Sequence, residues 1–391
     1  MKLCYALLYF DPGKVDRDLD AYLDAVRAAH DLPQALAARG HEVSVVHLYP
    51  FDGSLRREQV EHRFVAPGAA ARAIGRTLAT GHDERLAPRT PAWRAISRIL
   101  SSKPDVVHFF GTTLHLNLAL LLFRRGRRPP PVVLHCHGGE AARRRAARAL
   151  QAYGFARTAR FVFTTPEQAA MHARARLLDD ENRRVRYLME TSSRFGPLSR
   201  SSARRQTGMS GDPVFVWTAR LHPLKDPATA LRGFARIARA LRDARLYVYF
   251  QADELLPALQ AQVREDAVLR RRVHFRGGLP YRSMEAVYNS ADFLLQASRR
   301  EHSGCAVLDA MACGTIPVVT DIPSFRAMTG DGAVGVLFPP GDDEIMARRV
   351  LALPADRIAT EASAVRAYFD RNLSFPTLAR ELERMYEQIV S

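Results

Sequence analysis

Two short segments in the second half of the chain carry charged residues at spacings that suit the binding of an anion. In the first, Glu301 lies in a loop and Asp309 follows eight residues later, inside a short helix that we expect to begin at Gly304 and to end at Gly314. The first turn of a helix presents backbone N–H groups and the positive end of the helix dipole, so a phosphate binds well there. The backbone N–H groups that would face such an anion belong to Ser303, Gly304 and Cys305.

A second segment, residues 216–227, supplies positive charge. Arg220 and Lys225 lie five residues apart in the turn that follows a predicted strand, and together they can hold one diphosphate. A solvated basic turn is the alternative for any arginine. Lys225 is harder to explain in that way, because it is the only lysine after residue 212 in a chain that uses arginine almost everywhere. The pair therefore predicts a diphosphate site.

Both segments resemble the retaining, nucleotide-sugar-dependent glycosyltransferases of family four, which carry a Glu-x7-Glu pattern and a lysine after Gly-Arg-Leu at these places. The resemblance implies that Glu301 contacts hydroxyls of the donor sugar and stabilises cationic character at its anomeric carbon. It implies that Asp309, shorter than the family's second glutamate by one carbon–carbon bond of about 1.5 Å, binds the donor ribose. Arg220 and Lys225 would stabilise the leaving diphosphate.

The best candidate in the first half of the chain is a histidine. His137 follows a predicted strand at residues 131–136 and precedes two glycines, so a substrate can approach it closely. The resemblance places a histidine here that contacts the donor sugar. His108 and His135 lie inside predicted strands, and we expect both in the core.

Two further loops match the family pattern less well. Relatives place a glycine pair after the first strand, where the diphosphate or the acceptor approaches, and here only Gly13 and Lys14 can serve. Pro12 makes that loop stiffer, so the acceptor side is expected to differ from that of typical members. Arg276 and Gly277 follow a short predicted strand and are assigned to the nucleobase side, with a plain turn as an equal alternative.

No metal or cofactor is expected. Asp16-Arg17-Asp18 looks like a DxD metal motif, but it directly precedes a predicted helix, where capping acids are common. A departing nucleoside diphosphate needs a cation to stabilise its developing charge, and Arg220 and Lys225 can provide it without a metal. The nucleotide sugar is a substrate and not a cofactor.

Charge and composition bear on partners and location. The chain has 391 residues and a net charge of +16, with arginine clusters at 124–128 and 143–145. A basic face of this kind can hold a protein against an anionic membrane, and a simple solvated face is an equal alternative. Nucleic acid is not expected as a partner, because no recognition motif accompanies the charge. The first residues are typical of a strand and not of a signal peptide, so we expect a cytoplasmic protein with peripheral membrane contact.

Strands and helices alternate along the whole chain, which predicts an α/β protein with parallel sheets. We expect two Rossmann-like domains of the GT-B class, facing across a cleft. The expected parts are an acceptor-side domain at 1–195, a linker at 196–212, a nucleotide-sugar donor domain at 213–365 and a helix at 366–391 that packs back on the first domain. Within the first part, we expect a helix at 20–39 that breaks just before Pro33.

These observations predict a glycosyltransferase that moves a sugar from a nucleoside-diphosphate donor to an acceptor hydroxyl, with retention implied by the resemblance alone. The acceptor can be a sugar, a lipid-linked molecule or a small molecule. One alternative is a GT-B protein that binds a nucleotide sugar or a partner without turnover. Others are a sugar-nucleotide epimerase and a phosphorylase of the glycogen type, which would need Lys225 to carry pyridoxal phosphate.

Overall fold

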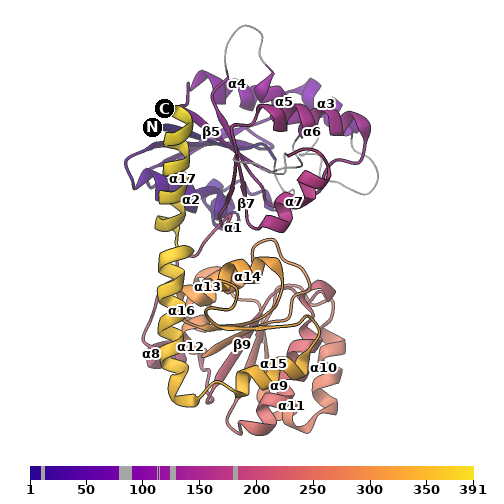
Figure 1. The fold of residues 1–391 in the computed structure, drawn as a ribbon, viewed down its shortest axis with the longest axis vertical. Coiled ribbons are helices and arrows are strands. Elements are labelled where there is room, and N and C mark those ends of the chain that lie inside the picture. The colour runs from indigo at the N-terminus through magenta and orange to yellow at the C-terminus, as the bar shows by residue number, and fades with distance from the viewer. Residues whose placement is uncertain (10–13, 79–89, 112, 114, 124–128, 179–183) are drawn as a thin grey trace. The chain divides into compact units, whose positions relative to one another are not determined.

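The computed structural model describes residues 1–391 except 10–13, 79–89, 112, 114, 124–128 and 179–183, which Figure 1 draws as a grey trace. The chain forms two compact units. Unit 1 comprises Met1–Thr191 together with Leu378–Ser391, and unit 2 comprises Ser192–Thr377. Each unit contains one sheet and the helices that pack on it, so the predicted pair of α/β domains is confirmed.

Unit 1 is built on an eight-stranded sheet with the order β3-β4-β2-β1-β5-β6-β7-β8. All neighbouring strands are parallel except β3 and β4, which form an antiparallel hairpin. The strands are β1 (Lys2–Leu7), β2 (Glu42–Leu48), β3 (Gly53–Arg57), β4 (Val60–Val65), β5 (Val106–Phe110), β6 (Val132–His135), β7 (Arg160–Phe163) and β8 (Val185–Tyr187). The helices are α1 (Leu19–Ala25), α2 (Ala28–Ala37), α3 (Ala69–Leu78), α4 (Trp93–Ser101), α5 (His115–Leu122), α6 (Arg145–Arg157) and α7 (Pro166–Arg174).

Unit 2 contains a six-stranded parallel sheet with the order β11-β10-β9-β12-β13-β14. Its strands are β9 (Val214–Thr218), β10 (Arg245–Tyr249), β11 (Val273–Gly277), β12 (Phe293–Gln296), β13 (Ile316–Thr320) and β14 (Val336–Phe338). Its helices include α8 (Arg200–Thr207), α9 (Pro227–Ala240), α10 (Leu256–Glu265), α11 (Ala267–Arg272), α12 (Met284–Ser290), α13 (Cys305–Ala312), α14 (Pro323–Thr329), α15 (Asp343–Leu351) and α16 (Ile358–Asn372). Short 3-10 turns lie at Pro223–Lys225, Tyr281–Ser283 and Ala355–Arg357.

The central strands of both sheets are buried at every position, as apolar runs covered on both faces should be. This holds for β5, with the sequence Val-Val-His-Phe-Phe, and for β9, with the sequence Val-Phe-Val-Trp-Thr. Such strands place their carboxyl ends at one edge of the sheet, where the following loops carry polar residues. In unit 2 these loops lead into α9 and α13 (Figure 1).

One local expectation was wrong, and one local feature was not predicted. The helical stretch at 20–39 breaks at Val26 and Arg27, and Pro33 lies inside α2. Pro33 is the sixth of the ten residues of α2 and has no backbone N–H to donate within the helix. The β3–β4 hairpin was not predicted, since its sequence is rich in charged residues and its turn uses Glu58 with a φ of +52°.

The stretch 196–212, expected as a linker, contains α8 and belongs to unit 2. The polar side chains of α8 include two arginines that form ion pairs with the buried carboxylate of Asp292. Arg204 donates to Asp292 at 3.1 Å, and the Arg200 guanidinium lies 2.5 Å from it. The boundary between the units lies earlier, between residues 191 and 192.

The C-terminal region forms α16 and then α17 (Phe375–Val390), which belongs to unit 1 from Leu378 onward. Tyr386 of α17 is fully buried there, with its hydroxyl 3.1 Å from that of Tyr5 and 2.5 Å from His108 Nδ1. The end of the chain is thereby built into the core of the first sheet.

Candidate functional site

Unit 2 contains a cavity of about 220 Å³ at the carboxyl ends of β9 and β12, beside the first turn of α13. Three segments line it. The turn after β9 contributes Arg220 and Lys225, the loop before α13 contributes Glu301, and α14 contributes Phe325. The lining also includes Ser303, Gly304 and Cys305. The structure therefore brings Glu301 together with the residues that the sequence assigned to a diphosphate, whereas His137 and Asp309 do not line this cavity.

Lys225 and Glu301 form an ion pair across this cavity, with the ammonium group donating to Oε1 of the carboxylate. The two side chains are only 20% and 12% exposed, so water screens the pair weakly. The hydroxyl of Ser298 donates a second hydrogen bond to the same carboxylate oxygen at 2.8 Å. From the sequence we expected the two residues to bind separate parts of the donor, and in the structure they also form an ion pair with each other.

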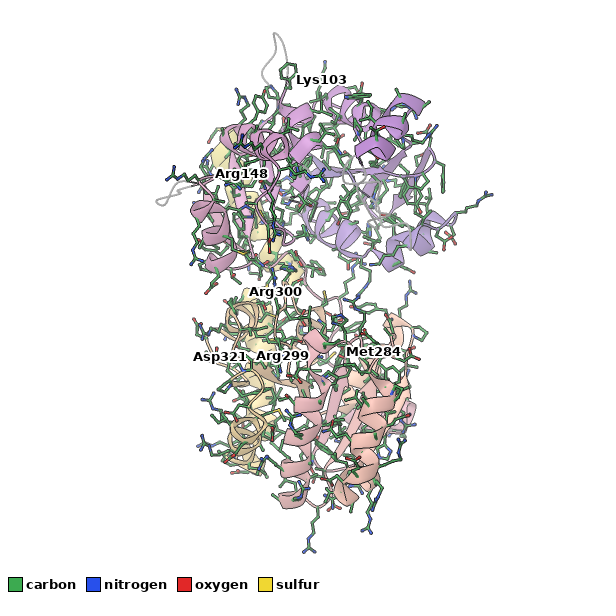
Figure 2. The ribbon with its side chains drawn as sticks, turned by 90° about the vertical axis from the view of Figure 1, so that its right-hand side faces the viewer. Lys103, Arg148, Met284, Arg299, Arg300 and Asp321 are labelled. Carbon is green, nitrogen blue, oxygen red and sulfur yellow. The ribbon has the colours of Figure 1, made fainter. Side chains whose placement is uncertain are left out.

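The loop that carries Glu301 is tied to the turn that carries Lys225. Arg299, labelled in Figure 2 beside Arg300, donates its backbone N–H to Leu224 O at 2.9 Å. The Arg299 guanidinium donates to Asp226 at 3.0 Å and 2.8 Å. Asp226 in turn caps α9 in the left-handed conformation, with a φ of +42°. These contacts fix the two segments against each other and so fix the ion pair.

Gly304 allows close packing at the start of α13. A Cβ atom at this position would lie 2.6 Å from Cε1 of Phe325, closer than carbon atoms can approach. The carbonyl of Gly304 accepts from the backbone N–H groups of Val307 and Leu308 at 2.7 Å and 3.1 Å. Glycine therefore lets the first turn of α13 reach the floor of the cavity.

Asp309 lies one turn further along α13 and is only 6% exposed. Its Oδ1 accepts hydrogen bonds from the hydroxyls of Ser193 at 2.5 Å and Tyr281 at 2.8 Å. The ring of Tyr281 is stacked on Phe195, with centroids 4.5 Å apart. Sequence analysis missed Ser193 and Tyr281, and no local pattern marks either of them, because their contact with Asp309 joins distant segments.

The nucleobase-side candidates are not part of the cavity lining among the described residues. Arg276 is exposed on β11, with its guanidinium 5.3 Å from the ring centroid of Tyr247. Gly277 ends that strand with a φ of +70°, a turn conformation that suits glycine. The assignment of this pair to the nucleobase side stays a prediction, with a plain turn as its alternative.

His137 lies in unit 1, directly after β6, with its side chain 22% exposed. Its Nδ1 is 2.7 Å from Oε2 of Glu190, and its ring packs against Phe110 at a centroid distance of 4.4 Å. Its Nε2 is buried and has no hydrogen-bond partner among the described residues. Nothing in the local sequence links Glu190 to His137, because the two residues are far apart in the chain.

His108 and His135 are core residues, as predicted. Both are fully buried, and His108 Nε2 lies 3.0 Å from His135 Nδ1. Burial disfavours the charged imidazolium, which lowers the pKa of His108 to about 3 and that of His135 well below its usual value. Both imidazoles are therefore neutral at physiological pH.

The remaining candidates lie near the start of the chain. Gly13 lies outside the described residues, and Lys14 is exposed. Asp18 caps α1, accepting from the N–H groups of Asp20 and Ala21 at 3.0 Å and 3.3 Å, so the interpretation of this motif as a helix cap is confirmed. Among the described residues there is no cluster of three or more histidine, cysteine or acidic side chains able to hold a metal.

Two family models match the two units separately. Residues 25–187 match the model described as "Glycosyltransferase Family 4", and residues 212–356 match the model "Glycosyl transferases group 1". The chain belongs to glycosyltransferase family 4. The family's N-terminal model thus covers the region of His137, and the C-terminal model covers the cavity with Lys225 and Glu301.

Curated relatives of this family 4 protein include the D-inositol 3-phosphate glycosyltransferases of Nocardia farcinica and Geodermatophilus obscurus. They are 28% and 32% identical over 184 and 186 residues, which cover 45% and 44% of this chain. The phosphatidyl-myo-inositol mannosyltransferase of Mycobacterium leprae is 28% identical over 43% of this chain. The chain spans 40%, 40% and 44% of the lengths of these three relatives.

Solved structures of similar fold cover nearly all of this family 4 chain. Sucrose-phosphate synthase from Thermosynechococcus elongatus matches with a TM-score of 0.71 and 18% identity, over 99% of this chain and 98% of its own. Anabaena HepE, solved with UDP and glucose, matches with a TM-score of 0.67 and 16% identity, over 99% and 100%. These likenesses confirm the predicted GT-B fold.

Proposed function

We propose that this family 4 protein transfers a sugar from a nucleoside-diphosphate sugar to an acceptor hydroxyl. The observation that carries the proposal is the cavity of unit 2, which Arg220, Lys225 and Glu301 line beside the first turn of α13. Two cations and a helix N-terminus suit a diphosphate, and a carboxylate suits the hydroxyls of a sugar. Family membership supports the same function, as do similar folds solved with UDP-glucose and with ADP.

In the proposed mechanism, the diphosphate competes with Glu301 for the ammonium group of Lys225. Binding of the donor then exchanges one anion for another beside the lysine and frees Glu301 to accept hydrogen bonds from the donor sugar. Ser298 keeps the carboxylate in place during this exchange, because its hydroxyl contacts the same oxygen. Arg220 and Lys225 stabilise the charge that develops on the leaving diphosphate.

Asp309 is proposed to bind the donor ribose. A carboxylate has about four lone-pair sites, and the hydroxyls of Ser193 and Tyr281 both contact one oxygen, Oδ1. The two hydroxyls orient the carboxylate through these hydrogen bonds. His137 is proposed to contact the donor sugar from unit 1, and Gly13 and Lys14 remain the proposed acceptor-side residues.

Retention at the anomeric carbon and transfer without a metal or a cofactor are part of the same proposal. Family membership alone supports retention, and the two cations that can stabilise the leaving group support transfer without a metal. The test is a transfer assay with a panel of nucleotide sugars, in which chromatography measures the released nucleoside diphosphate and NMR measures the configuration of the product. Equal rates with and without EDTA and a product of retained configuration are expected. A rate that requires added Mg²⁺, or an inverted product, would contradict this part.

The acceptor is proposed to be a sugar, a lipid-linked molecule or a small molecule.

The protein is proposed to be cytoplasmic, with peripheral contact to an anionic membrane. The exposed arginine cluster at 143–145 supports this contact, because each cation near an anionic membrane surface contributes roughly 1 kcal/mol of binding free energy. The cluster at 124–128 lies outside the described residues. The described part of the chain holds no helix long and apolar enough to cross a membrane. Sedimentation with vesicles should require anionic lipid and weaken with salt, and binding insensitive to both would contradict the proposal.

A second candidate function is nucleotide-sugar binding without turnover. It is favoured by Asp309, which replaces the family's glutamate and accepts hydrogen bonds from two protein hydroxyls. The transfer assay separates the two functions. Donor binding without release of a nucleoside diphosphate, across all three acceptor classes, would favour the second.

A further inference from the structure

Gln296 places a polar side chain at the end of an otherwise apolar strand of unit 2. It is the last residue of β12, which has the sequence Phe-Leu-Leu-Gln and is buried at every position. Gln296 is only 2% exposed, yet it belongs to the lining of the cavity of about 220 Å³. Burial of an amide is unfavourable unless hydrogen bonds replace those that it made with water. The partners of this side chain therefore indicate its role.

One of the two polar atoms of the Gln296 amide has a partner in the protein. Its Nε2 donates to the carbonyl oxygen of Thr218 at 2.7 Å, and Thr218 is the last residue of the neighbouring strand β9. Because a backbone carbonyl can only accept, this contact determines which amide atom faces Thr218. The other atom, Oε1, makes no hydrogen bond to any of the described residues. The cavity is thus lined by a buried side chain with an unused acceptor.

The chemistry of the cavity indicates which group of a ligand could meet this acceptor. Arg220 and Lys225 supply positive charge, whereas the Glu301 carboxylate and Gln296 Oε1 can only accept hydrogen bonds. An ionised phosphate also has only acceptor atoms, so the cations attract it and the amide oxygen repels it. A hydroxyl group can donate and therefore suits both acceptors.

The sugar of a nucleotide sugar can supply that hydroxyl. Glu301, proposed to bind sugar hydroxyls, lines the same cavity as Gln296, whereas Asp309, proposed to bind the ribose, does not. Two protein hydroxyls of this region already have partners. That of Thr218 lies 2.9 Å from the hydroxyl of Tyr288, and that of Ser298 donates to Glu301.

We propose that Gln296 is a specificity-determining residue whose Oε1 accepts a hydrogen bond from one hydroxyl of the donor sugar. The inference rests on the proposed function for the identity of the ligand. The hydrogen bond to Thr218 holds the amide in the orientation that presents Oε1. Gln296 thereby favours a donor sugar with a hydroxyl at one position over an analogue that lacks it.

Calorimetric titration in EDTA tests this role with the nucleoside diphosphate and the nucleotide sugar that bind wild type most tightly among UDP, GDP, ADP, TDP and their common sugar conjugates. Gln296→Met keeps the length of the side chain but removes the amide. Gln262→Met is the matched control, since Gln262 also donates from Nε2 to a backbone carbonyl, that of Ala228 at 3.3 Å, and does not line this cavity. Gln296→Met should raise the Kd of the nucleotide sugar about three- to tenfold and leave that of the nucleoside diphosphate unchanged. The control should change neither.

Monodeoxy analogues of the same nucleotide sugar identify the hydroxyl. One of them should bind wild type and Gln296→Met equally, while the others keep the difference between the two proteins. A general change in the shape of the cavity would instead weaken the nucleoside diphosphate as well, or weaken every analogue by the same factor. Either result would overturn the proposal, as would an equal Kd of the nucleotide sugar for both proteins. If wild type binds neither the nucleoside diphosphates nor their sugar conjugates, the proposed function fails and this inference fails with it.

Discussion

The two units share an architecture but differ in the polar residues that they bury. Unit 1 buries several histidines, and two hydrogen-bonded groups contain most of them. His30, His62 and His47 form a chain with nitrogen–nitrogen distances of 3.0 Å at both contacts. The second group joins His108 to His135 and to Tyr386. Unit 2 instead relies on charged pairs, such as Lys225 with Glu301 and the arginines of α8 with Asp292.

This difference gives the units opposite responses to acid. A buried histidine is protonated only when the unit unfolds, whereas a paired carboxylate resists protonation in the folded state. Unit 1 should therefore lose stability at a higher pH than unit 2. The contrast also shows that two units of the same architecture can differ inside. One buries histidines that are neutral at neutral pH, and the other contains ion-paired side chains at a candidate anion site.

The largest expected effect is the loss of unit 1 in mild acid. Burial lowers the pKa of His47 and His108 to about 3, of His62 to about 2 and of His172 to about 4. Their unfolded pKa is about 6.5, so the unfolded state binds more protons below that pH. The stability that these residues contribute is complete above pH 6.5 and falls as the pH drops toward 4, by about 2–3 kcal/mol for each at pH 4.5.

Hydrogen exchange measured by mass spectrometry can follow both units in one sample. Between pH 6.5 and 4.5, peptides of unit 1 should lose protection while those of unit 2 keep it. In unit 2, desolvation raises the pKa of Asp343, but hydrogen bonds from Arg236 and Arg232 outweigh it and lower the pKa below its usual value. The stability that such a carboxylate contributes to unit 2 is therefore lost only below about pH 4. Simultaneous loss of protection in both units would show that the histidines do not distinguish them.

The next largest effect concerns the ion pair of unit 2. Lys225→Met should weaken the binding of a nucleoside diphosphate by about ten- to a hundredfold, because a charged donor contributes about 1.5–3 kcal/mol. Glu301→Gln should bind the free diphosphate at least as well as wild type, since it removes the anion that competes for Lys225. Calorimetric titration measures both. Weaker binding in Glu301→Gln than in wild type would show that the pair does not compete with the ligand.

Packing at α13 gives a smaller, purely structural effect on unit 2. Gly304→Ala should destabilise unit 2 by about 1–3 kcal/mol, because the new methyl group overlaps the Phe325 ring. Gly196→Ala is the matched control, since a Cβ atom there meets nothing within 4 Å. Urea unfolding followed by the fluorescence of Trp217, which is buried in unit 2, measures the change. Adding Phe325→Leu should restore part of the loss, and equal costs for Gly304→Ala and Gly196→Ala would contradict the packing account.

The smallest effect tests how Asp309 is held. Tyr281→Phe removes one hydrogen bond to Asp309 but keeps the stacking on Phe195, so the Kd of the preferred nucleoside diphosphate should rise about three- to tenfold. The 2′-deoxy form of the same nucleotide should be less sensitive to this change if Asp309 binds the ribose. Equal sensitivity of both nucleotides would place Asp309 outside the ribose site.

The sequence predicted what depends on local pattern. Apolar runs marked the buried strands, including β5 and β9, and the glycine at 304 with its neighbouring acid at 301 marked the helix and loop of the cavity. The charged β3–β4 hairpin was missed, because its partly exposed strands lack an apolar run. Pairing of α8 with Asp292 was also missed, so a polar helix was taken for a linker.

Contacts across the sheet or between loops could not be predicted in this way. Glu190 meets His137 only because β6, β7 and β8 lie side by side in that order. Tyr281 and Ser193 meet at Asp309 for a similar reason, since α13 brings its carboxylate between two segments that are distant in the sequence. The spacing of residues along the chain does not indicate which distant residues become neighbours in the fold.

The central claim is that the cavity of unit 2 binds the diphosphate of a nucleotide donor without a metal. The most direct measurement is a thermal-shift panel of UDP, GDP, ADP and TDP and their common sugar conjugates in EDTA, comparing wild type, Arg220→Ala/Lys225→Ala and the surface control Arg271→Ala. We predict that one nucleotide family raises the melting temperature of wild type and of the control, by the equivalent of about 2.7 kcal/mol at a hundredfold excess over Kd, and that the double variant shows no such rise. No shift with any nucleotide, or an equal shift in the double variant, would contradict the account.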